Sequence, residues 1–404
     1  MISRVEFHQP VYTVDPSGCS DADDGFSIWD DGGLHLMIHI ADPTAELQND
    51  EVFDRILKQA QTHYPFGEPP IHLFPEEILQ KASLMNGKKK TISVHAVFSS
   101  TEFELTSTTI EYLTVECLPC YRFTYEQAAA SNDKIFDMGI KLSMKLAKAR
   151  NGLLKDNLIL TIPYLEDGVI KLQPDAPRVK DMKAMIAEFA ILANTVFAKG
   201  LSDRNVFLRA VQLPLKTHSD ISSEPLTLLK IIEESVSAEY TVDKLPHDIV
   251  TGELYTHATS PLRRASDCIV HMMLKAQALN AASPFTESQL RQWATYLTGK
   301  SREFKQAQFA AIKRATLKWM ATKVPLDITT VVMSYKNGFI NIMITEVFSG
   351  AWWPVNISYT LKRHTHKGPA IKDKNKVTVA AVNISSNFKF DEGTLPDIDV
   401  MFPH

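Results

Sequence analysis

Alternating hydrophobic and polar positions predict β-strands in the first third of the chain. Residues 11–15 read VYTVD, and residues 34–42 read LHLMIHIAD, in which His alternates with Leu, Met and Ile. Residues 92–118 continue the same kind of pattern. Because a period of two places successive side chains on opposite faces of a sheet, we expect a β-rich N-terminal segment.

From about residue 139 the apolar residues recur at spacings of three and four, which is typical of amphipathic helices. We expect five such helices, within residues 139–150, 180–200, 224–235, 261–279 and 302–320. Strands followed by a run of helices indicate the α+β class, with a mixed sheet packed against helices.

The predicted helix at residues 261–279 carries signals for its start. Ser260 is a candidate N-cap, and Pro261 suits the first turn of a helix. Arg263 and Arg264 would then lie in the opening turn, where backbone N–H groups attract anions. One interpretation is a phosphate site, and the other is that both arginines are solvated surface residues.

After Pro325 the pattern indicates strands again. Two alternating runs surround Asn337-Gly338, a dipeptide typical of tight β-hairpins. Residues 352–361 and 375–384 add further predicted strands. These strands predict a small all-β barrel of about 80 residues at the C-terminal end.

Composition is that of a soluble globular protein, with 404 residues, 45% hydrophobic and 22% charged. No run of 18 apolar residues predicts a transmembrane helix, and the N-terminus lacks the apolar core of a signal peptide. Four cysteines suit a reducing compartment, so we expect a cytoplasmic or organellar protein. The CxxC at Cys117 and Cys120 lacks a second ligand pair, which favours ordinary thiols over a zinc site.

Charge is distributed unevenly along the chain. Residues 1–80 hold 15 Asp and Glu against 3 Lys and Arg, whereas residues 300–376 hold 14 Lys and Arg against 4 Asp and Glu. One interpretation is that the acidic part could bind a metal ion and the basic part a polyanion. The other is that surface charge merely varies along the sequence.

Four carboxylates occur within the ten residues from Asp15 to Asp24, at Asp15, Asp21, Asp23 and Asp24. Two unit charges 4 Å apart repel by about 4 kcal/mol at an effective dielectric of about 20. Such a cluster must be solvated, as in an acidic turn, or neutralised by cations. Hard divalent cations such as Mg²⁺ prefer carboxylate oxygens.

A second segment lies about 230 residues later, where residues 255–274 read YTHATSPLRRASDCIVHMML. Together the two segments resemble the ribonuclease II/R (RNB) family of 3′-to-5′ exoribonucleases. The family motif of an Asp, five residues and Asp-x-Asp-Asp matches the carboxylate cluster without a gap. The late motif YTHFTSPIRRYxDLxVHRxL is matched at Tyr255, Thr256, His257, Thr259, Ser260, Pro261, Arg263, Arg264, Asp267, Val270 and His271. Weaker resemblances fall in the expected order at residues 36–47, 62–90, 123–128 and 185–194.

The resemblance implies an RNB catalytic domain at residues 1–324 and an OB-fold RNA-binding domain at residues 325–404. It also implies a hydrolytic 3′-to-5′ exoribonuclease that degrades single-stranded RNA to nucleoside 5′-monophosphates. Phosphodiester hydrolysis is commonly catalysed by two divalent ions. We expect Mg²⁺, for which Mn²⁺ can substitute, and a monomer without membrane association.

The resemblance also assigns roles to single residues. Asp15, Asp21, Asp23 and Asp24 would bind metal, with Asp23 and Asp24 the most directly catalytic. Arg263 would clamp the scissile phosphate beside Ser260, as a forked and permanent cation can. Glu188 would help to read the terminal ribose, with Tyr255 beside it, although a structural salt bridge is the competing interpretation for Glu188. Tyr64 and Tyr125 would stack on terminal bases.

Aromatic and basic residues of the C-terminal barrel are further candidates for RNA contact. Trp352, Trp353 and Tyr359 could stack on bases or belong to the barrel core. The basic candidates are Lys362, Arg363, Lys367, Lys372, Lys374 and Lys376.

Several departures from the family pattern bear on activity. We expect the usual N-terminal cold-shock domains to be absent, because the Asp motif begins at residue 15. Ala265 replaces a common aromatic residue, Gly25 stands where Ala is common, and Lys313 lies where a late glutamate is often found. Two rival functions therefore stay open: a catalytically weak or inactive RNA-binding scaffold, and a phosphodiesterase acting on short oligonucleotides or DNA.

Overall fold

The chain forms two compact units. The computed structural model describes residues 2–47, 50–65, 68–152, 164–166, 169–171, 176–212, 237–336, 339–346, 356–360, 374–383 and 397–401. The first unit comprises Met1–His63, Ile71–Leu158 and Pro177–Arg302, and the second comprises Tyr64–Pro70, Ile159–Ala176 and Glu303–His404. The expected domain boundary at residues 324 and 325 stays a prediction.

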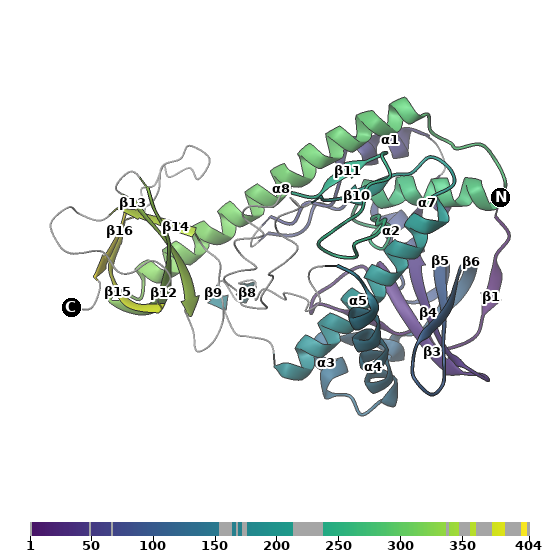
Figure 1. Ribbon diagram of the computed structural model, residues 1–404, viewed down its shortest axis with the longest axis horizontal. Helices are drawn as coiled ribbons and strands as arrows, with labels where there is room; N and C mark the ends of the chain where they lie inside the picture. Colours follow the sequence, from purple (N-terminus) through teal and green to yellow (C-terminus); the bar gives the residue numbers. More distant parts are fainter. Residues whose placement is uncertain are drawn as a thin grey trace. The chain divides into compact units, whose positions relative to one another are not determined.

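A five-stranded sheet organises the first unit (Figure 1). Its strands are β1 (Val5–Phe7), β3 (Asp24–Asp30), β4 (Leu34–Ala41), β5 (Gly87–Phe98) and β6 (Leu105–Cys117). The order is β1-β6-β5-β4-β3, in which β1 runs parallel to β6 and all other pairs are antiparallel. The strands predicted at residues 34–42 and 92–118 are confirmed.

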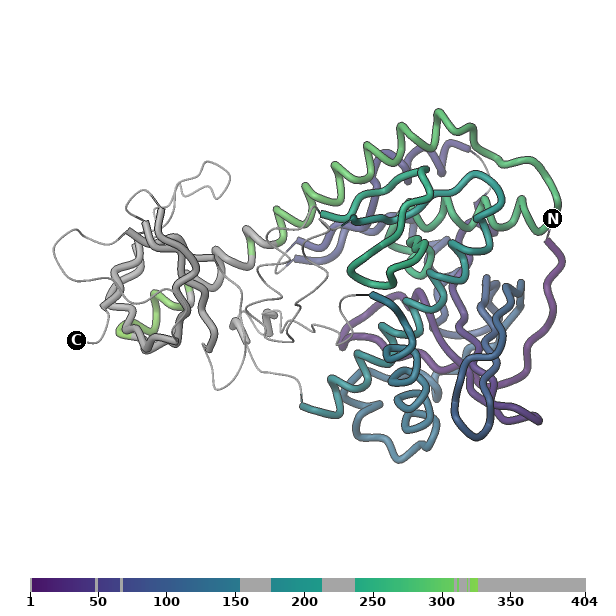
Figure 2. The backbone as a smooth tube through the Cα atoms, viewed as in Figure 1, coloured from purple at the N-terminus to yellow at the C-terminus, as the bar shows by residue number. Residues whose placement is uncertain are grey.

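One face of this sheet packs against two helices. Leu36, Ile38 and Ile40 are buried on that face, as their period of two requires. Helices α4 (Lys134–Ala149) and α5 (Pro177–Gly200) lie beside strands β3 and β4 in the tube view of Figure 2. These helices touch closely, because a methyl group at Gly139 would overlap Met185 Sδ. The mixed α+β architecture predicted from the sequence is therefore present.

Shorter elements complete the first unit. They are β2 (Thr13–Asp15) paired in parallel with β7 (Arg122–Thr124), β10 (Leu208–Ala210) paired with β11 (Glu239–Thr241), and the helices α1 (Asp50–Gln59), α2 (Glu76–Ala82), α3 (Tyr125–Ala130) and α7 (Ala265–Ala278). Single 3₁₀ turns lie at Pro43–Ala45 and Pro119–Tyr121. The strand expected at residues 11–15 corresponds to β2 and the neighbouring bridge of Tyr12 to Phe26.

An antiparallel sheet of five strands lies in the second unit, in the order β14-β13-β12-β15-β16. The strands are β12 (Leu326–Lys336), β13 (Phe339–Glu346), β14 (Asn356–Thr360), β15 (Lys374–Asn383) and β16 (Asp397–Met401). Pairing of Lys336 with Phe339 confirms the hairpin predicted around Asn337-Gly338. The strand number is that of an OB-fold, but closure into such a barrel stays a prediction. A two-stranded ladder of β8 (Tyr164–Glu166) and β9 (Val169–Lys171) also belongs to this unit.

Helix α8 (Glu287–Ala321) contributes residues to both units and begins 15 residues before the helix expected at 302–320. Its start has a recognisable signal, because Thr286 and Gln289 exchange side-chain and backbone hydrogen bonds as in a capping box. The expected helix at 224–235 lies outside the described residues. So do Trp352, Trp353, Lys362, Arg363, Lys367 and Lys372, and the side chains of Lys313, Tyr359, Lys374 and Lys376. In the described part of the chain, every helix is too short or too polar to cross a bilayer.

We predict that the free energy of unfolding falls as the pH is lowered from about 6.5 towards 3, partly because of His39. This side chain is fully buried between the hydroxyls of Ser27 and Ser93, each 3.1 Å away, and burial lowers its pKa to about 3. The unfolded chain then binds a proton that the folded chain does not, so folding loses stability with acid.

Urea unfolding at a series of pH values measures this effect. His39→Gln should reduce the slope of unfolding free energy against pH by up to about 1.4 kcal/mol per pH unit, the value for one proton. An unchanged slope in this variant would show that other groups carry the acid sensitivity.

Candidate active site

The four clustered carboxylates lie where two strands of the first unit begin and end. Asp15 is the last residue of β2, paired with Thr124 of β7, and Asp24 is the first residue of β3, paired with Ile40 of β4. Asp21 and Asp23 lie in the connection between these strands. Two different sheets, β2-β7 and the five-stranded sheet, therefore fix the two ends of the segment that carries the cluster.

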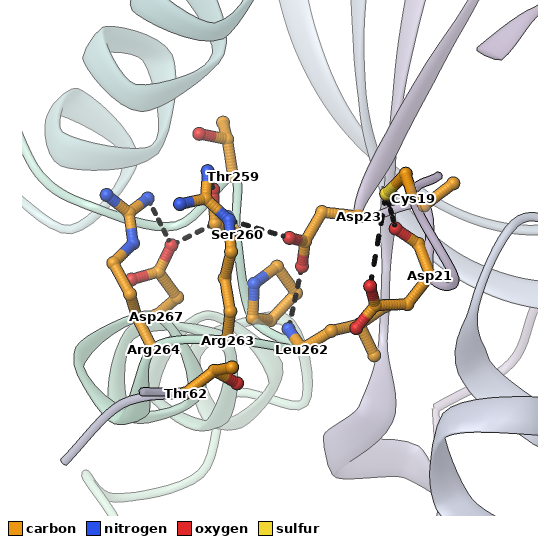
Figure 3. A network of polar contacts seen from close by, with 12 residues as sticks. Cys19, Asp21, Asp23, Thr62, Thr259, Ser260, Leu262, Arg263, Arg264 and Asp267 are labelled. Atoms are coloured by element: carbon orange, nitrogen blue, oxygen red, sulfur yellow. Dashed lines mark hydrogen bonds and ion pairs between the residues drawn. The ribbon is translucent and has the colours of Figure 1, made fainter. Parts of the chain in front are cut away.

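Asp23 connects this segment to the second sequence motif (Figure 3). The Leu262 N–H donates to Asp23 Oδ1 (2.7 Å), and Arg263 Nε donates to Asp23 Oδ2 (3.1 Å). The bonded residues are 239 and 240 positions apart in sequence. Two motifs that the sequence presents separately thus meet at one carboxylate.

The arginine-containing segment forms a turn before helix α7, which corrects our expectation. Helix α7 begins at Ala265, so Ser260 is not its N-cap and Arg263 is not in its opening turn. The reason is backbone pairing with the segment after α1: Thr62 N–H donates to the Arg263 carbonyl, and Ala265 N–H donates to the Ala60 carbonyl. This pairing keeps Arg264 in an extended conformation, with φ −136° and ψ 125°, so the helix begins only at Ala265.

Asp267 accepts hydrogen bonds that stabilise this turn. Its Oδ1 accepts from the Ser260 N–H (2.7 Å) and from Arg264 Nη2 (2.8 Å), and its Oδ2 accepts from the Ser266 hydroxyl (2.8 Å). Arg263 Nη2 donates to the Ser260 hydroxyl (2.7 Å), and its side chain remains 47% exposed. Arg263 can therefore be reached from solvent, whereas Arg264 is committed to Asp267.

Burial makes the carboxylate cluster electrostatically costly. It raises the pKa of Asp15, Asp23 and Asp24 to about 7 in each case. Repulsion by Asp23 adds to the effect at Asp15, and repulsion by Asp15 adds to it at Asp24. The positive charge of Arg263 opposes the shift at all three residues but does not cancel it. A further cation would stabilise the ionised forms.

Two carboxylate oxygens of the cluster are buried without a hydrogen-bond partner among the described residues: Asp15 Oδ2 and Asp21 Oδ2. His72 Nδ1 is the nearest basic nitrogen, 3.6 Å from Asp21 Oδ2. Cys19 donates from Sγ to the Asp21 carbonyl (2.8 Å). Sequence reasoning missed His72 and Cys19, because neither stands in a metal-ligand spacing.

The cluster has the donor chemistry of a Mg²⁺ site but not a finished ligand geometry. Hard oxygen donors and unpartnered buried oxygens both fit such an ion. Within the described ranges, however, no three His, Cys, Asp or Glu side chains converge on one metal position. The Arg263 guanidinium lies against Asp23, the residue we expect to be most directly catalytic.

Glu188 on helix α5 lies in a buried ion pair. Arg150 Nε donates to both of its carboxylate oxygens (3.1 Å each), and Arg150 Nη2 lies 3.0 Å from Oε1. The side chains of Arg150 and Glu188 are only 9% and 3% exposed. The pair lines a pocket of about 170 Å³ beside Leu146, Ile191 and Thr195. This arrangement favours the competing interpretation of Glu188 as a structural salt bridge.

The tyrosines expected at the site have different surroundings. Tyr125 begins α3, and burial, with the nearby charges of Asp24 and Asp15, raises its pKa. Tyr255 is buried, and its hydroxyl accepts from Asn194 Nδ2 (3.0 Å). Tyr64 belongs to the second unit and is 45% exposed. Tyr125 is thus the expected stacking residue that lies within electrostatic reach of the carboxylates.

Comparison with known proteins identifies the family. The family model described as "RNB domain" matches residues 5–232 and 223–280, more than half of the chain. The chain belongs to the RNB family. The match covers both the carboxylate cluster and the arginine turn, the two parts that meet at Asp23.

Relatives of this RNB chain include an uncharacterised ribonuclease of Synechocystis sp., 25% identical over 319 residues. The alignment covers 72% of this chain and 46% of the relative. The chain spans about half the length of the curated relatives that it matches.

Solved RNB structures share the fold at low sequence identity. Mycoplasma genitalium RNase R in complex with ribose-methylated single-stranded RNA has a TM-score of 0.78 at 16% identity, covering 98% of this chain and 72% of that one. Yeast Ssd1, described as a pseudonuclease, has a TM-score of 0.71 at 18% identity, covering 94% and 53%. Since an enzyme and a pseudonuclease both match, the fold alone does not decide activity.

We predict that Glu188→Ala lowers the free energy of unfolding by about 3–5 kcal/mol, because it removes the negative charge that the buried Arg150 guanidinium contacts. The double substitution Arg150→Met with Glu188→Leu should recover most of this loss. Asp137→Ala is the matched control, since it breaks the exposed pair with Arg178 and should cost less than about 1 kcal/mol. Urea unfolding measures all three. Unchanged stability together with weaker preference for RNA over DNA would instead support direct ribose contact.

Proposed function

We propose that this RNB protein is a divalent-metal-dependent 3′-to-5′ exoribonuclease that hydrolyses single-stranded RNA to nucleoside 5′-monophosphates. The observation that carries the proposal is the meeting of the carboxylate cluster with Arg263 at Asp23. Phosphodiester hydrolysis needs acceptors for a metal and a cation for the developing phosphate charge, and this site has both side by side. The ribonuclease character of the relatives supports the reaction class.

In the proposed site Asp15, Asp21, Asp23 and Asp24 hold Mg²⁺, or Mn²⁺ in its place. When bound, the metal lowers the pKa of a water ligand and neutralises charge on the phosphoryl oxygens. The unpartnered oxygens of Asp15 and Asp21 are the acceptors that this chain keeps available. Raised carboxyl pKa values indicate that the ionised cluster needs such a cation near neutral pH.

In this proposal Arg263 binds the scissile phosphate and stabilises its developing charge. Its bonds to Asp23 and Ser260 orient the guanidinium, and its half-exposed side chain is open to an incoming anion. A planar, permanently charged fork stabilises a developing phosphate charge better than a point charge does. The Ser260 hydroxyl acts with it as a substrate contact.

RNA binding is proposed to involve tyrosines of both units and the strands of the second unit. Tyr125 would stack on a terminal base, as would Tyr64, and Tyr255 would lie beside the terminal ribose. A C-terminal OB-fold would bind the single strand through basic and aromatic residues. We further propose a monomer in a reducing compartment, the cytoplasm or an organelle, in keeping with four free cysteines.

A second candidate is an RNA-binding protein with little or no nuclease activity. Two observations favour it: the likeness to the pseudonuclease Ssd1, and the absence, among the described residues, of three converging metal ligands. The retention of all four carboxylates argues against it. The experiment below separates the two candidates.

We predict that Asp23→Asn abolishes turnover and leaves RNA affinity near normal. Asparagine keeps an oxygen that can accept from the Leu262 N–H, so the turn should survive, but it removes the negative charge. The assay follows a 5′-labelled single-stranded RNA of about 30 nucleotides on a denaturing gel, with binding measured separately by filter retention.

The controls are EDTA in place of Mg²⁺, a DNA of the same sequence and a five-nucleotide RNA. Mg²⁺-dependent shortening from the 3′ end, absent on DNA and lost in Asp23→Asn, supports the exoribonuclease. Binding without shortening under Mg²⁺ and Mn²⁺ supports the scaffold. Preferential cleavage of the short RNA or the DNA supports an oligonucleotide phosphodiesterase.

We predict that Arg263→Ala lowers single-turnover rates by about 100-fold or more, the scale expected for losing one group that stabilises a transition state. Arg263→Lys should recover only part of the rate, because lysine retains the charge but not the fork. Arg178→Ala removes an exposed arginine on α5 and serves as the matched control. Equal rates for Arg263→Ala and the control would remove Arg263 from the catalytic site.

A further inference from the structure

A cluster of aromatic and titratable side chains crosses the sheet of the first unit on one face. Trp29 on β3 stands directly opposite His35 on β4. His95 on β5 pairs with Met37, two residues from His35, and is therefore the diagonal neighbour of His35. Glu111 on β6 is in turn the diagonal neighbour of His95. The four side chains follow one diagonal line across four strands.

Hydrogen bonds connect His35, His95 and Glu111 in series. His35 Nδ1 lies 2.9 Å from His95 Nε2, and His95 Nδ1 lies 3.0 Å from Glu111 Oε1. His35 Nε2 faces the Asp31 carbonyl oxygen at 3.4 Å. The Trp29 ring stacks on both imidazoles, with interplanar angles of 9° and 23°. The rings are thus held with their outer nitrogens on oxygen acceptors and their inner nitrogens facing each other.

The positions of the protons on the two imidazoles decide whether a cation could bind here. Glu111 as a carboxylate only accepts, so His95 Nδ1 carries its proton and His95 Nε2 presents a lone pair. If His35 likewise donates outward to Asp31, two lone pairs face each other at 2.9 Å. Two facing lone pairs repel each other unless a cation bound by both nitrogens lies beside the line that joins them. The alternative is an ordinary hydrogen bond, in which His35 Nδ1–H donates to His95 Nε2 and His35 Nε2 carries no proton.

The distances suit a transition metal. Metal–imidazole bonds of about 2.05 Å separate two cis nitrogens by about 2.9 Å at a right angle and about 3.4 Å at a tetrahedral angle. The observed 2.9 Å lies at the short end of this range, so the rings need to move apart by about 0.5 Å at most. Outer nitrogens that donate to a carboxylate or a backbone carbonyl are the usual support of metal-binding histidines.

We propose that His35 Nδ1 and His95 Nε2 form a two-imidazole site for a divalent transition-metal ion such as Ni²⁺, Cu²⁺ or Zn²⁺. Glu111 orients His95, Trp29 fixes both rings, and water supplies the remaining ligands. His95 and Glu111 are 21% and 36% exposed, so an ion can enter from solvent. Trp29 lies five positions along β3 from Asp24, about 16 Å, so the site is distinct from the carboxylate cluster.

Titration of the tag-free protein with Ni²⁺ tests the proposal, with Mg²⁺ in large excess to saturate hard oxygen sites. Calorimetry should give one Ni²⁺ per chain, and the paramagnetic ion should quench the fluorescence of Trp29. Glu111→Gln should weaken Ni²⁺ binding by about 10- to 100-fold, the usual effect of losing such a support. His35→Gln with His95→Gln should abolish this binding.

Two controls assign the signal. His8→Gln removes an exposed histidine of the same unit and should leave Ni²⁺ affinity unchanged. Trp29→Phe should retain binding by calorimetry but lose the quenching. The proposal is overturned if the double histidine variant, shown to be folded by circular dichroism, binds Ni²⁺ as the wild type does. It is equally overturned if the wild type binds no Ni²⁺ and Trp29 fluorescence responds only to pH.

Discussion

The burial of carboxylates at the junction between the sheet and helix α7 is the constraint on which the rest of the structure depends. An ionised carboxylate removed from water must find hydrogen-bond donors or opposite charge. Asp23 meets this requirement with a backbone N–H and a guanidinium that the chain supplies from some 240 residues away. The turn that presents those donors is consequently as much a part of the carboxylate cluster as the aspartates themselves.

The same solution recurs around the site. Asp267 is satisfied by the Ser260 N–H, Arg264 and the Ser266 hydroxyl. Asp42, just after β4, accepts from Lys275 on α7 (3.1 and 3.2 Å) and from the Thr44 hydroxyl (2.6 Å).

Burial alone would raise the pKa of Asp42, but neighbouring His271, Lys275 and Arg4 hold it well below its usual range. These fully paired carboxylates are structural. The oxygens of Asp15 and Asp21 that have no hydrogen-bond partner among the described residues stand out against them.

Much of this fold could be predicted from periodicity, and most of the site from two motifs. Strand β4 and helix α5 lie where their apolar spacings predict them, although seven of the eight residues of β4 are buried, on both faces of the sheet. The start of α7 could not be predicted in this way. Ser260-Pro261 is a good local start signal, but pairing with the backbone around Thr62 overrides it.

Other parts of the site depend on contacts that local sequence does not reveal. Among the described contacts of Glu188 is Arg150, 38 residues away, and nothing in the sequence around either residue indicates the other. The expected departure at Gly25 has a local structural reason, because a Cβ there would lie 2.9 Å from the Tyr12 carbonyl oxygen. That carbonyl accepts from the Phe26 N–H (2.8 Å), so glycine permits the close approach of the backbone at Tyr12 to strand β3.

The long sequence separation between Asp23 and its donors has a consequence for folding. Contacts that close a loop of 239 residues form late, since the chain loses much conformational freedom before they contribute. A nascent chain that ends before Leu262 would carry its acidic segment without the donors that stabilise it. The arrangement around Asp23 is thus a property of the completed unit, and a truncated or half-folded copy contains the aspartates without the donors that join them to the arginine turn.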